Sequence, residues 1–351
     1  MKNFKKKLIY VGTLSKTPDR DSYWIREFSK LGWNVIQFSS SVKFKGIKIL
    51  NKIKKRINIS KENKQMKSDL INLCLEVKPD WLHFRRPVEF DKHTIKKLKT
   101  FIPLVTHYFN DDPFSKKAPF GLNWQFRNAI NHYDMHFVYR KKNIEEFRSS
   151  GEKNIYHVPP MYDHLTRVKT NNYKIKDFIA DAAFIGHWEN DNRVKFLSDI
   201  MEQGLRLIVR GGMWDRGITN TPLERLAPIN GAYDIREYNE IYSNVIAGIC
   251  FFSKINRDTF TRRALEIIAV GGVLVCERTD EAMSYFEDGK EALFFDTSSE
   301  LIRNINILKQ KPNLRKKIQE AGYKKLIDGK FSINDRAIFI ENLVRAFFKK
   351  N

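Results

Sequence analysis

Short apolar runs alternate with longer segments whose apolar residues recur every three or four positions through the first half of the chain. The short runs are typical of buried strands, and the longer segments are typical of amphipathic helices. Their regular alternation predicts a parallel sheet with helices on both faces. The expected strands are residues 7–11, 34–38, 81–84, 103–107, 135–139 and 155–158, and the expected helices are residues 21–31, 66–77, 91–100 and 141–150.

The pattern breaks at Pro159 and Pro160, and a polar stretch follows to about Lys176. We interpret this stretch as a linker, because prolines and polar residues are typical of domain boundaries. A second alternation then begins, and the chain ends in an amphipathic segment over residues 332–350. The sequence therefore predicts an α/β protein with domains at 1–165 and 166–330, followed by a terminal helix at 331–351. The expected strands of the second domain are residues 182–186, 205–210, 245–252 and 273–276.

Charge is distributed unevenly between the two halves of the chain. The net charge is +22, and residues 1–165 hold 33 Lys and Arg against 16 Asp and Glu, which leaves +17 there and +5 in the remainder. Residues 43–67 are the most basic stretch, with apolar positions at helical spacing between the lysines. This stretch is typical of an amphipathic helix on an anionic membrane surface, or of a helix that docks on its own domain with solvated lysines. The charge itself indicates either an acidic partner or a bias of composition.

The three cysteines lie in apolar segments at spacings that no metal site uses, which favours buried thiols in a reducing compartment. The apolar run near the N-terminus is too short for a signal peptide, and no stretch has the length of a membrane span. We therefore expect a cytoplasmic protein, either free or peripheral at the inner face of the membrane.

The stretch from Asp258 to Asp296 carries the candidate chemistry. It combines a helix with Arg263 and Glu266, the glycine pair Gly271 and Gly272, and a short apolar strand. A carboxylate can bind paired sugar hydroxyls, arginine forms charge-assisted bonds with phosphate, and glycine lets phosphate approach the backbone. The alternative is a solvated helix with an ordinary Arg–Glu pair three residues apart.

This stretch resembles the donor-site segment of the group 1 glycosyltransferases. The run R-x-x-E-x-x-A-x-G-G at residues 263–272, followed by Asp-Gly-Lys-Glu at 288–291, is similar to the spore maturation protein B-like branch of that family. The resemblance implies the GT-B fold, in which two Rossmann-like domains face a cleft and a C-terminal helix crosses back to the first domain. The chain departs from the pattern at Asp258, where the family has the longer Glu, and at His187, where the family has Arg.

The resemblance also implies roles for residues along the chain. His107, Asp258 and Arg193 are the implied catalytic residues, with His107 and Asp258 on the transferred sugar and Arg193 on the diphosphate. Asp111 and Asp112 are candidates for binding the acceptor, and no metal is implied. For His107 a satisfied loop histidine is the alternative, and for the aspartates a helix cap. The implied donor-binding residues are Gly12, Gly186, His187, Arg193, Gly211, Arg263, Glu266, Gly271 and Gly272.

The predicted function is transfer of a sugar, with retention and without a metal, from a nucleotide sugar to an acceptor. The nucleotide sugar is a co-substrate with UDP or GDP as the expected nucleotide, and no further cofactor is expected. The acceptor would be a cell-envelope glycan, a lipid-linked glycan or a protein. A nucleic-acid-binding or DNA-modifying GT-B protein and an inactive GT-B scaffold are the alternatives. No nucleic acid is expected as a partner, because the chain has no recognised nucleic-acid motif.

Overall fold

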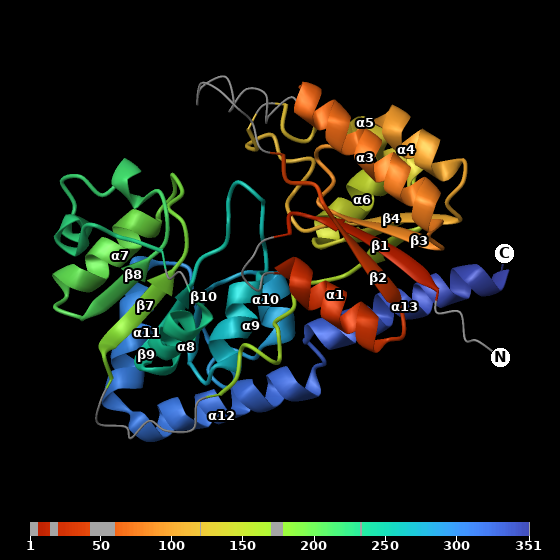
Figure 1. Ribbon diagram of the computed structural model, residues 1–351. Helices are drawn as coiled ribbons and strands as arrows, with labels where there is room; N and C mark the ends of the chain where they lie inside the picture. The colour runs from red at the N-terminus through yellow and green to blue at the C-terminus, as the bar shows by residue number, and fades with distance from the viewer. Residues whose placement is uncertain are drawn as a thin grey trace. The chain divides into compact units, whose positions relative to one another are not determined.

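The computed structural model describes residues 6–14, 20–42, 60–119, 121–169, 178–231 and 234–350 (Figure 1). The chain forms two compact units, each built on its own parallel sheet. Unit 1 comprises Met1–Pro159 with Ile333–Asn351, and unit 2 comprises Pro160–Ser332. The predicted α/β class with two parallel sheets and flanking helices is confirmed. Among the described residues, no helix has the length and apolar character needed to cross a membrane.

Unit 1 contains a six-stranded sheet in which every neighbouring pair is parallel. The strand order is β2-β1-β3-β4-β5-β6, so the chain starts near one edge and moves stepwise to the other. The strands are apolar because helices cover both faces. Their bounds are β1 (Lys7–Gly12), β2 (Asn34–Ser39), β3 (Trp81–Arg85), β4 (Leu104–Phe109), β5 (Met135–Val138) and β6 (Ile155–His157).

Among the described residues, helices cover both faces of this sheet (Figure 1). On the first face α1 (Arg20–Lys30) contacts α13 (Ile333–Lys350), and the ring of Phe28 packs edge-on against Trp81 at 5.0 Å. On the second face the helices are α3 (Lys61–Val77), α4 (Lys92–Lys99), α5 (Trp124–Ala129) and α6 (Lys141–Ser149). Of the basic stretch 43–67, residues 43–59 lie outside the described residues, and the rest belongs to the end of a loop and the start of α3.

Unit 2 contains a five-stranded parallel sheet in the order β11-β10-β9-β7-β8. Apolar clusters fill both sides of it. Leu197 and Leu301 belong to the cluster under α7 and α11, and Tyr242 and Leu265 belong to the cluster under α8 and α9. The strands are β7 (Ala180–Ile185), β8 (Leu207–Arg210), β9 (Val245–Cys250), β10 (Leu274–Glu277) and β11 (Leu293–Phe295). The helices are α7 (Arg193–Glu202), α8 (Ile235–Ser243), α9 (Arg262–Ala269), α10 (Asp280–Tyr285), α11 (Ser298–Gln310) and α12 (Pro312–Asp328).

All five strands of unit 2 point the same way, so the loops that follow them gather at one edge of the sheet. In open parallel sheets this carboxyl edge is where ligands bind. The loops after β7, β8 and β9 meet there, next to the N-terminus of α9. The geometry of these loops defines the candidate site.

Candidate functional site

The loops after β7 and β8 are joined to each other by hydrogen bonds. Trp188 N donates to Gly212 O at 3.0 Å, and Gly212 N donates to His187 Nδ1 at 3.0 Å. The second bond makes Nδ1 an acceptor, so a neutral imidazole at His187 has its proton on Nε2. His187 is thus held by the neighbouring loop at the position where the resemblance places a cation.

Gly186 and Gly211 are glycines because the two loops touch through their backbones. A Cβ on Gly211 would lie 1.8 Å from the carbonyl oxygen of Gly186, and the φ of Gly211 is +144°. The same carbonyl accepts a hydrogen bond of 2.9 Å from Trp214 Nε1. Only residues without a side chain fit here, so the structure brings Gly186, His187 and Gly211 together as one surface at the carboxyl edge.

Arg263 lies against this surface. A Cβ on Gly186 would be 2.7 Å from its Nη2, its Nη1 donates to Phe251 O at 3.3 Å, and its guanidinium faces the ring of Phe184 at 5.1 Å. Among the residues that the structure describes, Arg263 has no carboxylate within ion-pair distance.

Arg263 also carries a permanent charge. Burial is the largest influence on its pKa and lowers it, but Tyr242 and other nearby acidic groups raise the pKa above its ordinary value. The guanidinium is therefore a charged, partly buried group whose charge no carboxylate of the described chain balances at close range. Such a group is suited to binding an anion.

Glu266 lies one turn further along α9 and is 4% exposed. Its Oε1 is 3.1 Å from Arg262 Nε and 3.3 Å from Arg167 Nε, and its Oε2 accepts from Tyr238 OH at 3.0 Å. Arg167 also lies over the ring of Tyr238, 4.0 Å from its centroid. The sequence correctly places Glu266 within the helix, and its role with a ribose stays a prediction. In this conformation the carboxylate is already held by three side chains.

Asp258 lies on the loop before α9. It is half-buried, and its backbone N–H donates to Ser253 O at 2.9 Å. Its predicted contact with a sugar hydroxyl stays a prediction. The loop position leaves it at the same edge as Arg263.

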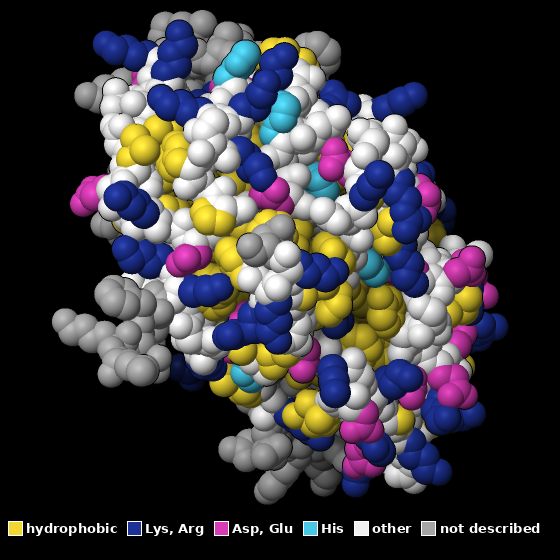
Figure 2. Space-filling model, turned by 90° about the vertical axis from the view of Figure 1, so that its right-hand side faces the viewer, with side chains coloured by type: hydrophobic (Ala, Val, Ile, Leu, Met, Phe, Trp, Pro, Cys, Tyr) yellow, Lys and Arg dark blue, Asp and Glu magenta, His cyan; other side chains and the backbone are white. Residues whose placement is uncertain are grey.

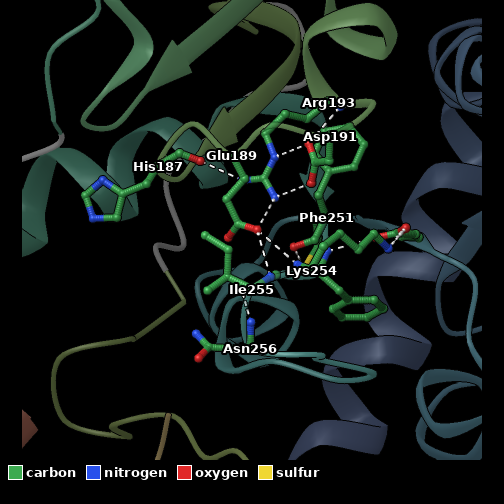
Figure 3. A network of polar contacts seen from close by, with 12 residues as sticks. His187, Glu189, Asp191, Arg193, Phe251, Lys254, Ile255 and Asn256 are labelled. Atoms are coloured by element: carbon green, nitrogen blue, oxygen red, sulfur yellow. Dashed lines mark hydrogen bonds and ion pairs between the residues drawn. The ribbon is translucent and has the colours of Figure 1, made fainter. Parts of the chain in front are cut away.

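Arg193 is the N-terminal residue of α7 and is 4% exposed (Figure 3). Its Nε and Nη2 each donate to Asp191 at 2.7 Å, and its Nη1 donates to His187 O at 2.6 Å. Its Nη2 is also 3.5 Å from Glu189 Oε2. The predicted cation is therefore present at the edge, but each of its three nitrogens is directed at an acceptor of its own loop.

Gly271 and Gly272 lie at the other end of α9 and not at the carboxyl edge. Their amides close the helix, because Gly271 N donates to Ile268 O at 2.9 Å and Gly272 N to Ile267 O at 2.8 Å. The φ of Gly271 is +88°, and a Cβ on Gly272 would lie 2.7 Å from Tyr242 O. This is a glycine helix stop. The structure corrects the predicted grouping of these glycines with Arg263, because the full length of the helix separates them.

In unit 1 the end of β1 packs on a buried carboxylate. A Cβ on Gly12 would lie 2.6 Å from Asp21 Oδ2, which also accepts from Thr13 N at 2.8 Å. Asp21 Oδ1 accepts from Tyr10 OH at 3.0 Å and from Arg85 Nη1 at 2.5 Å. Gly12 is therefore at the carboxyl edge of its sheet, as predicted. Its donor-binding role stays a prediction.

His107 is placed in the core of unit 1 and not at an edge. The predicted strand ended at this residue, but β4 continues to Phe109, so the prediction was wrong by two residues. His107 is fully buried, its Nε2 is 2.9 Å from His136 Nδ1, and its ring packs at 4.9 Å from that of Phe126. A buried imidazole among aromatic rings does not reach a bound sugar. The structure therefore gives its predicted catalytic role no support.

We expect the buried histidines to make stability depend on pH. Burial lowers the pKa of His83 to about 3, with Arg85 adding to the effect, and burial followed by His136 lowers the pKa of His107 well below its ordinary value. Both imidazoles are neutral when folded, whereas the unfolded chain takes up their protons below a pH of about 6.5. Each histidine should therefore lower the free energy of unfolding by about 1.4 kcal/mol per pH unit between pH 6 and 5.

Urea denaturation at pH 7, 6 and 5 measures this slope. His107→Phe removes one titrating group from aromatic surroundings and should flatten the slope. An unchanged slope would contradict the buried, neutral state of His107.

Asp111 and Asp112 follow β4 and have different surroundings. Asp112 is 1% exposed, and its Oδ1 accepts from Phe114 N and from Asn143 Nδ2, both at 3.0 Å. It is a loop-closing residue. The helix-cap alternative is wrong for Asp112, because the next helix, α5, begins at Trp124 with Asn123 at its N-cap. Asp111 is half-buried and forms an ion pair with Arg86. Its predicted contact with an acceptor stays a prediction.

Sequence reasoning missed two polar groups at the carboxyl edges. One is the pair of Asp21 and Arg85 in unit 1, and the other is the carboxylate pair of Glu189 and Asp191 in unit 2. Arg85 directly follows a predicted strand, which was a usable signal. Nothing in the sequence shows that Asp191 would take the guanidinium of Arg193.

Comparison with known proteins agrees with this fold. Residues 193–342 match the model of a family described as glycosyl transferase-like. The whole chain is similar in structure to sucrose-phosphate synthase from Thermosynechococcus elongatus, with a TM-score of 0.72, 11% identity and coverage of 99% of this chain and 100% of that one. No curated protein sequence matches the chain.

Two further solved structures are similar. Anabaena HepE in complex with UDP-glucose has a TM-score of 0.66 at 12% identity over 97% of this chain and 99% of that one. The DNA-modifying enzyme β-glucosyltransferase has a TM-score of 0.56 at 16% identity over 97% and 99%. These likenesses show the fold: the chain has the GT-B architecture, with two parallel α/β sheets.

Proposed function

We propose that the protein is a glycosyltransferase that transfers a sugar from a nucleoside-diphosphate sugar to an acceptor. The observation that carries the proposal is the position of Arg263. At the carboxyl edge of unit 2 the neighbouring cations Arg193, Arg262 and Lys254 are each paired with a carboxylate. Arg263 has no such partner within the described chain and lies against the glycine surface of Gly186.

The surroundings of Arg263 suit a diphosphate. Gly186 and Gly211 present backbone without side chains, and Arg263 occupies the first turn of α9. That turn has no acidic residue, and its N-cap, Thr261, makes no side-chain capping bond. The positive end of the helix dipole and the guanidinium then act on the same anion. The glycosyl transferase-like match over residues 193–342 supports the same assignment.

The chemistry follows from these groups. Breaking the bond between the anomeric carbon and the phosphate oxygen leaves negative charge on the diphosphate and positive charge on the sugar. Arg263 and the N-terminus of α9 would stabilise the leaving diphosphate, which is the kind of electrostatic contribution that usually dominates catalysis. Glu266 would hold the ribose once its bonds to Arg167 and Tyr238 rearrange, and Asp258 a sugar hydroxyl. We further propose that the transfer retains the anomeric configuration and needs no metal. The same proposal places the protein in the spore maturation protein B-like branch.

We propose the chemical class of the acceptor from the net charge of the first half of the chain. Residues 1–165 carry a net charge of +17, by the counts given above, which suits an anionic glycan or lipid-linked acceptor of the cell envelope. On the face shown in Figure 2, Lys and Arg side chains are scattered among acidic and apolar ones and do not form a continuous basic stripe. The chain has no recognised nucleic-acid motif, so we favour the glycan acceptor over a DNA-modifying activity.

Nucleotide binding tests the proposal. We expect one of UDP, GDP, dTDP, ADP and CMP to raise the thermal unfolding midpoint of the purified protein, because a ligand at a hundred times its Kd stabilises the folded state by about 2.7 kcal/mol. The matching nucleoside without phosphate should give a much smaller shift, since Arg263 binds phosphate. If none of the nucleotides or their sugars shifts the midpoint, the donor site does not exist and the inactive-scaffold alternative stands.

A further inference from the structure

One carboxylate joins the loop after β7 to the loop after β9 (Figure 3). Glu189 Oε2 accepts a hydrogen bond from the backbone N–H of Lys254 at 3.0 Å and a longer one from Ile255 at 3.4 Å. The same oxygen is 3.5 Å from Arg193 Nη2, and the side chain of Glu189 is 14% exposed. Segments that lie 65 residues apart in the chain therefore meet at one atom.

Arg193, the charged neighbour of Glu189, is held by other acceptors of its own loop. Asp191 binds the guanidinium of Arg193 through both carboxylate oxygens, and His187 O takes a further donor. Moving Arg193 to a ligand would leave Asp191 and Glu189 as largely buried carboxylates without their counter-charge, which is costly. The geometry therefore suits a fixed anchor better than a phosphate ligand.

Glu189 anchors the middle of the loop after β9. Residues 251–261 run without helix or strand from the end of β9 to α9, and they carry Asp258. Within the loop Asp258 N is bonded to Ser253 O, and Asn256 N to Ser253 Oγ. These bonds curl the loop. Side chains from other elements hold it in place: Glu277 at its beginning through Phe252 N, Glu189 in its middle, and Thr279 near its end, where Oγ1 donates to Thr259 O at 2.5 Å.

We propose that Glu189 is a positioning residue, and that Arg193 acts with it. By binding the amides of Lys254 and Ile255, Glu189 would set the loop in the conformation that presents Asp258 and the N-terminus of α9 to the donor. The donor part of this inference rests on the proposed function, whereas the anchoring rests on the contacts alone. It assigns Arg193 to holding the loop and leaves Arg263 as the cation that meets the diphosphate.

Two substitutions separate anchoring from general stability. Glu189→Ala removes the acceptor, whereas Glu189→Gln keeps an oxygen for the two amides. Glu240→Ala is the matched control, because Glu240 is 48% exposed and pairs with Arg236 on the surface of α8. Hydrogen–deuterium exchange of the peptide that carries Lys254 and Ile255 reports the anchor, and calorimetric titration with UDP reports the donor site.

For Glu189→Ala we expect exchange at least tenfold faster in that peptide and a Kd for UDP weakened by about tenfold, the effect of losing bonds to a charged acceptor. Glu189→Gln should stay within about threefold of the wild type in both measurements, given that a neutral acceptor still makes both bonds, and Glu240→Ala should change neither.

Unchanged exchange in Glu189→Ala would overturn the anchor. Faster exchange with an unchanged Kd would overturn the link between loop and donor. Equal losses in Glu189→Gln and Glu189→Ala would assign the effect to charge and would also overturn the proposal. If the wild type binds neither UDP nor any other nucleotide, the proposed function fails and the donor part of this inference fails with it, while the exchange result still decides the anchor.

Discussion

Arg263→Met is expected to weaken the binding of the nucleoside diphosphate that the protein recognises by roughly 30- to 100-fold. A hydrogen bond to a charged group contributes about 1.5–3 kcal/mol, so the loss of one such bond to phosphate accounts for a change of this size. Methionine keeps the apolar contact with Phe184 and removes the charge. Calorimetric titration with the nucleotide selected by thermal shift measures the change in Kd.

The control for Arg263 is an arginine that is exposed and already paired. Arg303→Met suits this purpose, because Arg303 is 65% exposed and lies on α11, 3.9 Å from Glu300. Arg263→Lys should fall between methionine and the wild type, since lysine keeps the charge but lacks the planar fork. An unchanged Kd in Arg263→Met, at an unchanged unfolding midpoint, would remove Arg263 from the donor site and with it the main support for the proposed function.

The fold could be predicted because each helix and strand has a local pattern of apolar and polar residues in the sequence. Alternating strand and helix patterns give parallel sheets with helices on both faces, and the double proline marks the change of unit at Pro159 and Pro160. Gly186, His187 and Gly211 were implied by the family resemblance, and the structure brings them together because the carboxyl ends of parallel strands meet at one edge. The basic stretch is a separate case, since residues 43–59 lie outside the described residues.

The remaining site residues could not be placed from sequence for two physical reasons. His107 was expected at an edge because the strand was ended at it, and two further strand residues place it in the core instead. Gly271 and Gly272 were grouped with Arg263 because they are neighbours in sequence. A helix of eight residues is about 12 Å long, so neighbours at its two ends lie at opposite edges of the sheet.

Arg193 shows a further limit of the sequence, which concerns the acceptor that a charged side chain binds. Its position after β7 was predicted correctly, but a sequence pattern does not show which acceptor a guanidinium will take. Asp191 is two residues away and binds it through both oxygens. Arg263, which has no such neighbour, remains available at the same edge. The distinction between an arginine that holds a loop and one that holds a ligand therefore came only from the contacts.

Asp21→Asn is expected to lower the free energy of unfolding of unit 1 by about 3 kcal/mol, because breaking a buried ion pair leaves the other charge without a partner. The side chains of Asp21 and Arg85 are 1% and 13% exposed. Asparagine keeps the size of the side chain and one of the two acceptor oxygens, which in the wild type serve Tyr10 OH and Thr13 N separately. The change therefore removes the charge together with one acceptor. Amide exchange of β1 and β3 during urea titration measures the stability of unit 1.

The double variant decides whether the pair or its members matter. Arg85→Met alone should cost a similar amount, since it leaves Asp21 buried without the guanidinium of Arg85. Combining Asp21→Asn with Arg85→Met removes both charges, and the double variant should recover to within about 1 kcal/mol of the wild type, which corresponds to a coupling energy of several kcal/mol. Additive losses in the double variant would show that Asp21 and Arg85 stabilise unit 1 independently. In that case the packing of Gly12 against Asp21, and not the ion pair with Arg85, would explain why the carboxylate is buried.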